Sequence, residues 1–114
     1  GKIGSQWLEA AQLKQRDNAV QMCALAALEL ALSTPLCTED IWAENIAGDY
    51  VAIQAIRRSL IRSMSREALL EAAGIDAGVL ADFIQSLRPA KKNETAASQW
   101  LYGEDQAVCS NDSR

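Results

Sequence analysis

The side chains of this 114-residue chain with the clearest potential for chemistry are basic, and most of them lie beyond its midpoint. Seven of the eleven Lys and Arg residues fall in two windows that contain no acidic residue. They are Arg57, Arg58, Arg62 and Arg66 in the first window and Arg88, Lys91 and Lys92 in the second. Guanidinium and ammonium groups at this density can bind nucleic-acid phosphates and release counterions. The pattern equally fits a solvated helix face that pairs with Glu67 and Glu71, followed by a basic surface loop.

Gln54 adds an amide side chain next to the first basic window. Gln54 and Arg58 are one helical turn apart, and amide and guanidinium groups are those that contact base edges in pairs of hydrogen bonds. If the helix that carries them is the one that reads DNA, these two residues are the best candidates for direct base contacts. The candidate nucleic-acid-binding residues are therefore Gln54, Arg57, Arg58, Arg62, Arg66, Arg88, Lys91 and Lys92.

Catalytic and metal sites are not predicted. The chain has no histidine, and its three cysteines, Cys23, Cys37 and Cys109, form no metal-binding or redox spacing. No glycine-rich phosphate loop or nucleophile motif occurs, and the acidic residues fall mostly where helices begin, where capping explains them. We therefore expect a protein that is not an enzyme and that needs no metal or cofactor.

The cysteines and the apolar segments predict a reduced, cytoplasmic protein with no membrane span. The longest apolar run, residues 19–32, is interrupted by Gln21 and Glu29 and is shorter than the ~20 residues that a bilayer requires. Cys23 lies inside this run and is expected to be a buried small hydrophobe. Cys109, in a polar segment, is expected to be an exposed thiol. The net charge of −4 also argues against an indiscriminate nucleic-acid binder.

These side chains must be positioned by helices, because the composition predicts an all-α chain. It is 49% hydrophobic, has only two prolines and six glycines, and shows no strand-like alternation. The length suits one compact bundle of five to six helices over residues 1–102, with N-terminal helices in 5–47 and a helix-turn-helix region in 49–102. Residues 103–114 are polar and acidic and are expected to form a flexible tail.

The N-terminal half is expected to supply the apolar centre of the bundle. Residues 5–33 have a long helical pattern in which Asp17 and Asn18 can begin a new helix. From Ala19 onward this pattern is apolar nearly all round, which is typical of a central helix or of a subunit interface. A further helix is expected at 38–47, and Asp49 is expected to cap another over 50–64. The apolar side of that last helix is expected to contain Val51, Ile53, Ile56, Leu60 and Ile61.

Residues 65–87 contain two short helical patterns joined by a tight turn. Ser65 and Asp76 are suited to cap them, and Gly74 takes the left-handed conformation of a helix end without steric cost. The apolar faces of the two helices are expected to close on each other. These faces comprise Leu69, Leu70 and Ala73 in the first helix and Leu80, Phe83, Ile84 and Leu87 in the second.

Within residues 65–88, the run 72–84 resembles the turn and second helix of the Cro/C1 repressor-type (XRE) DNA-binding domains. Leu70, Gly74 and Leu80 occupy the places of that family's small or branched residue, its glycine and its later branched residue. The resemblance implies a helix-turn-helix whose second helix enters the major groove of duplex DNA. It implies a transcriptional regulator, which we expect to dimerise through the apolar N-terminal helices.

The chain departs from this family at the positions that would face DNA. These are Ala77, Gly78, Ala81 and Asp82, which offer no hydrogen-bond donor to a base and one carboxylate that repels phosphates. Helical corners of the same kind also occur in bundles that never bind DNA. Two functions therefore remain open. The first is a small DNA-binding regulator that holds the duplex mainly by its phosphates. The second is a protein-interaction module, such as an adaptor, antirepressor or inhibitor.

Overall fold

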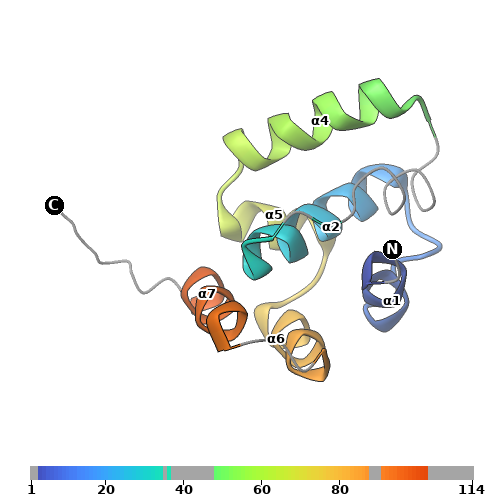
Figure 1. Ribbon diagram of the computed structural model, residues 1–114. Helices are drawn as coiled ribbons and strands as arrows, with labels where there is room; N and C mark the ends of the chain where they lie inside the picture. Colours follow the sequence, from blue (N-terminus) through green and yellow to red (C-terminus); the bar gives the residue numbers. More distant parts are fainter. Residues whose placement is uncertain (1–2, 35, 37–47, 88–90, 103–114) are drawn as a thin grey trace, which may run out of the picture.

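The computed structural model describes residues 3–34, 36, 48–87 and 91–102, and within these residues it contains six helices and no strand (Figure 1). The helices are α1 (Ile3–Ala10), α2 (Asn18–Leu32), α4 (Tyr50–Ser63), α5 (Arg66–Ala73), α6 (Ala77–Ser86) and α7 (Lys91–Tyr102). The all-α prediction is confirmed. The helix expected at 38–47 and the tail at 103–114 lie outside the described residues.

Helix α2 is the centre of the fold. Eleven of its 15 residues are buried, and α1, α4, α5 and α7 all contact it (Figure 1). Small residues such as Ala24, Ala27 and Ala31, all fully buried, let the surrounding helices approach closely. Of the two interpretations of this apolar helix, the central-core one is therefore correct. The N-terminal dimer interface that the sequence allowed stays a prediction.

The new helix expected to begin at Asp17 and Asn18 does begin there, but the helix before it ends earlier than expected. Helix α1 ends at Ala10, Gln12 takes a positive φ of 61°, and α2 begins after Asp17. The connecting loop is held by Gln21, whose Nε2 donates to the carbonyl oxygens of Lys14 (3.1 Å) and Arg16 (2.8 Å). This division folds α1 back against α2.

Trp7 is the main contact between α1 and the core. Its side chain is fully buried, and its Nε1 donates a 2.9 Å hydrogen bond to the carbonyl oxygen of Ala24. Its ring lies 5.2 Å from that of Phe83 on α6, at a tilted angle of 44°. Tilted aromatic pairs at this separation are favourable. Trp7 therefore links three helices at one point.

Three of the predicted helix caps are confirmed, whereas the side chain of Asp17 makes no capping hydrogen bond at the start of α2. Asp49, Ser65 and Asp76 each accept a hydrogen bond from the backbone N–H three residues later, at 3.4, 3.1 and 3.0 Å. Gly74 ends α5 with a φ of +72°, a conformation that costs glycine little. These caps define where α4, α5 and α6 begin and where the turn between α5 and α6 lies.

The two helices around Gly74 do not close on each other as expected. Helix α5 packs chiefly on α2, and α6 packs on α7, while α5 and α6 share few close contacts with one another. The reason is that α2 presents apolar surface on all sides and covers Leu69, Leu70 and Ala73, which are buried. The pair is a corner of a bundle built around α2, and its use as a DNA-reading unit stays a prediction.

Candidate functional site

Arg57, one of the predicted phosphate contacts, is engaged inside the protein. Its Nε and Nη2 donate to Oε1 of Glu29 on α2, at 2.9 and 2.6 Å. The side chain of Glu29 is only 4% exposed and that of Arg57 15%. The other carboxylate oxygen of Glu29 accepts the backbone N–H of Leu36 at 2.9 Å. One carboxylate therefore joins α2, α4 and the segment after α2.

Gln54 and Arg66 are also drawn into internal contacts. Gln54 is buried, and its Oε1 accepts a 3.3 Å hydrogen bond from Nη1 of Arg57. Arg66 donates from Nη1 to the carbonyl oxygen of Trp100 (3.0 Å) and from Nη2 to the carboxylate of Glu67. The hydrogen bond from Arg66 lowers the pKa of Glu67, with a smaller contribution from its backbone. Arg66 thus ties the start of α5 to the end of α7.

Arg58 and Arg62 are the predicted basic residues that the structure brings together at the surface. They lie one turn apart on α4, both are exposed, and neither has an ion-pair partner among the described residues. Arg88 and the side chains of Lys91 and Lys92 lie outside the described part of the chain. The described cations thus include two exposed guanidinium groups on α4, while Arg57 and Arg66 serve the fold.

The orientation of α4 differs from the one that its apolar pattern predicted. Ile53 is 2% exposed as expected, but Val51 is 71% and Ile56 46% exposed. The physical reason is the buried carboxylate of Glu29, which draws Arg57 and the neighbouring Gln54 to the inner face of the helix. Rotated in this way, α4 presents part of its apolar side to solvent.

This rotation opens an apolar groove between α2 and α4 that sequence reasoning missed. The groove has a volume of about 410 Å³. It is lined by Asn18, Ala19, Met22 and Cys23 from α2 and by Gly48, Asp49, Ala52, Ile53, Ile56 and Leu60 from the start and one side of α4. The size is that of sites that receive an apolar ligand or an anchoring side chain. The feature that could have predicted the groove is the pairing of Glu29 with Arg57, and these two residues are 28 positions apart in the chain.

Cys23, at the bottom of this groove, is a buried free thiol as predicted. Burial raises its pKa above the ordinary value of 9.0, because the thiolate loses solvation. The neutral thiol is therefore favoured in the folded state. The raised pKa of Cys23 makes the stability of the fold depend on pH. Its contribution is fully present below the pKa of this thiol in the unfolded chain and is lost as pH rises through the higher pKa in the folded protein.

Alkylation of Cys23 by iodoacetamide at pH 8 is expected to be more than about a hundredfold slower in the folded protein than in concentrated urea. The thiolate must form, and the reagent must reach a side chain that local opening exposes only rarely. A variant with Cys37→Ser and Cys109→Ser reports on Cys23 alone, and mass spectrometry gives the rate. Equal rates in the two conditions would show that the fold does not protect the thiol of Cys23.

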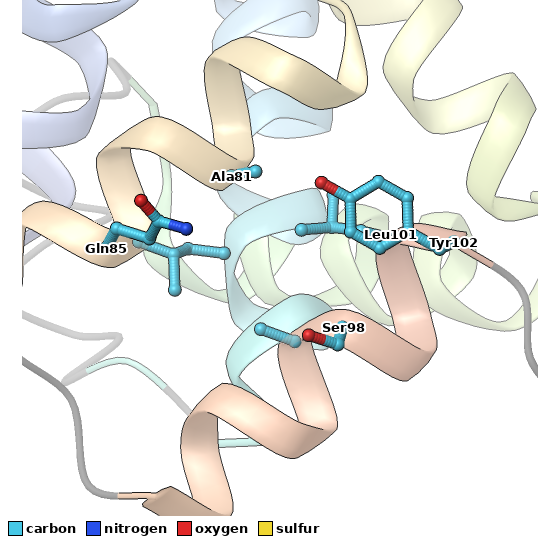
Figure 2. A pocket seen from close by; sticks show the side chains of 7 residues that line it. Ala81, Gln85, Ser98, Leu101 and Tyr102 are labelled. Carbon is cyan, nitrogen blue, oxygen red and sulfur yellow. The ribbon is translucent and has the colours of Figure 1, made fainter.

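Two smaller cavities do not combine an apolar lining with an exposed apolar side chain as the groove does. One, of about 280 Å³, lies between α6 and α7, where Ala81 and Gln85 face Ser98, Leu101 and Tyr102 (Figure 2). None of its described lining residues is charged. The other, of about 260 Å³, adjoins Glu29 and Arg57, whose charges already satisfy each other. Neither cavity presents an unused charged group to a ligand.

The described residues contain no group of three or more His, Cys, Asp or Glu side chains that could hold a metal ion. None of the described helices combines the length and the apolar character that crossing a bilayer requires. Comparisons with family models, with curated proteins and with solved structures find no match to this chain.

Proposed function

We propose that this protein is a helical interaction module that binds a helix of a protein partner along the groove between α2 and α4. The observation that carries the proposal is Ile56, an apolar side chain left 46% exposed at the rim of an apolar groove of about 410 Å³. A large apolar side chain beside an open apolar groove is typical of a surface that a partner covers.

The partner that suits this surface is an amphipathic helix. Helix α4 is 14 residues long, about 21 Å, so a partner helix of about four turns matches its length. Apolar residues at a spacing of three and four would enter the groove. Arg58 and Arg62 lie on the side of α4 away from the groove and are not among its lining residues, so the contact is expected to be mainly apolar.

Site-specific photo-crosslinking in the source cells tests this function. Benzoylphenylalanine at position 56 is expected to give an adduct with a protein, whereas the same group at the exposed position 82 on α6 is expected to give none. The partner found at position 56 is then purified, and Ile56→Asp is expected to weaken its binding by about thirtyfold or more, as at a central contact residue. The absence of an adduct at position 56, or binding unchanged by Ile56→Asp, would contradict the proposal.

DNA binding is the second candidate, and the exposure of Arg58 and Arg62 on one face of α4 supports it. The rest of the predicted reading surface supports it less. Gln54 is buried, and the exposed positions of α6 include Gly78, Val79 and Asp82.

Titration into random-sequence duplex DNA at two salt concentrations tests DNA binding. If the regulator function holds, affinity falls steeply with salt, and Arg58→Glu with Arg62→Glu lowers the slope by about one for each lost contact. Arg16→Glu with Lys14→Glu is the matched control on another exposed segment, and it is expected to leave the slope unchanged. No salt-dependent binding at low salt would exclude this candidate.

A further inference from the structure

Helix α4 is attached to the rest of the bundle by few buried side chains. It buries two of its 14 residues, Ile53 and Gln54, whereas α2 buries eleven of 15. It lies along one edge of the bundle, on the opposite side of α2 from α6 (Figure 1). Among the described helices, α2 is its principal packing partner. An element that buries so little surface opens locally at a lower free energy than the whole fold requires.

The polar groups between α4 and α2 regain water when the helix moves away. The ion pair of Glu29 with Arg57 is shielded from solvent, but both charges become hydrated if they separate together, so opening leaves no buried charge unpaired. Nε2 of Gln54 is buried without a hydrogen-bond partner in the described part of the chain, and opening hydrates this group as well. The closed position of α4 therefore depends mainly on the geometry of one ion pair and on the burial of Ile53.

Both ends of α4 provide points about which the helix can turn. At its C-terminal end, Met64 (φ −112°, ψ 138°) and Ser65 (φ −73°, ψ 167°) are extended and separate α4 from α5. At its N-terminal end, Gly48 has a φ of 137°, a conformation that glycine adopts readily. Short links of this kind absorb the backbone rotation of a hinge. Turning α4 outward uncovers Met22 and Cys23, the buried residues of α2 that line the groove.

We infer that α4 turns away from α2 as one unit, and that the ion pair of Glu29 with Arg57 sets the population of this open form. Helix α4 is then a gate over Met22 and Cys23. As a means of regulating the groove, the inference rests on the proposed function, because the groove is the proposed partner site. The opening itself requires no partner.

Alkylation of Cys23 in the full-length protein, with no partner added, measures this opening. All variants carry Cys37→Ser and Cys109→Ser, and iodoacetamide is kept dilute so that the rate follows the population of the open form. Arg57→Lys retains the positive charge but loses the two hydrogen bonds that Nε and Nη2 donate to Oε1 of Glu29. We expect this variant to raise the alkylation rate by about tenfold.

Two control variants separate the opening of α4 from other causes. Ile84→Val shortens a buried side chain on α6, so it makes global unfolding more frequent without changing a contact of α4. We expect it to change the alkylation rate by less than about twofold. Arg58→Lys, on the exposed side of α4, is expected to leave the rate unchanged. Hydrogen exchange is a second measurement, in which Ile84→Val is expected to speed the exchange of the central amides of α2 but not of those of α4.

The inference is overturned if Arg57→Lys leaves the alkylation rate unchanged, or if Arg58→Lys raises it equally. It is also overturned if Ile84→Val raises the rate by the same factor as it raises the unfolding equilibrium constant in urea, since Cys23 is then exposed by global unfolding. These outcomes remove the opening of α4 and leave the proposed partner site intact. The absence of a crosslink at position 56 removes the partner site and leaves the opening intact.

Discussion

Arg57→Met is expected to lower the free energy of unfolding by about 3–5 kcal/mol. The substitution leaves the carboxylate of Glu29 without its cation at a position where the side chain is only 4% exposed. Leaving a buried charge unpaired destabilises the fold by far more free energy than the lost hydrogen bonds had contributed to its stability. Urea denaturation followed by circular dichroism measures the change.

The neighbouring residue provides a matched control for this prediction. Arg58 is exposed and has no ion pair among the described residues, so Arg58→Met is expected to change stability by no more than about 0.5 kcal/mol. The double variant Glu29→Leu with Arg57→Met is expected to be more stable than Arg57→Met alone, because no buried charge then remains. Equal losses for Arg57→Met and Arg58→Met would mean that the ion pair does not hold α4 on α2.

Trp7→Ala is expected to lower the free energy of unfolding by about 3–5 kcal/mol. The fully buried ring contacts Phe83 and fills the space between α1, α2 and α6, so its removal leaves a cavity that small neighbours such as Ala24 cannot fill. It also removes the hydrogen bond from Nε1 to the Ala24 carbonyl oxygen. Chemical denaturation gives the change in stability.

Trp7→Phe separates the packing of the ring from its hydrogen bond. Phenylalanine retains an aromatic ring beside Phe83 but has no N–H to donate, so we expect a smaller loss of about 1–2 kcal/mol. If Trp7→Phe costs as much as Trp7→Ala, the hydrogen bond to Ala24 dominates and the account based on packing is wrong. If both variants are as stable as the wild type, α1 is not part of the core.

Helix α4 is rotated relative to the orientation that its apolar pattern predicts. The pattern of Val51, Ile53, Ile56, Leu60 and Ile61 predicts one continuous apolar face, and periodicity alone turns that face inward. The structure buries Ile53 but leaves Val51 and Ile56 exposed. The reason is that the buried carboxylate of Glu29 on α2 binds Arg57 and so turns the Arg57 side of α4 inward. A buried carboxylate requires a cation, whereas a partly exposed isoleucine costs little. The same rotation removed Gln54 and Arg57 from the predicted DNA-binding surface and created the groove.

The sequence by itself determined the helical class, the caps at Asp49, Ser65 and Asp76, and the turn at Gly74, because these depend on side chains within about four residues of each other. It also determined that α2 is apolar on all sides. Only the tertiary structure decided that α2 is enclosed by its own chain, that α5 packs on α2 instead of on α6, and that α4 turns Ile56 outward. These outcomes depend on contacts between residues far apart in the chain, above all that of Glu29 with Arg57, which no local pattern encodes.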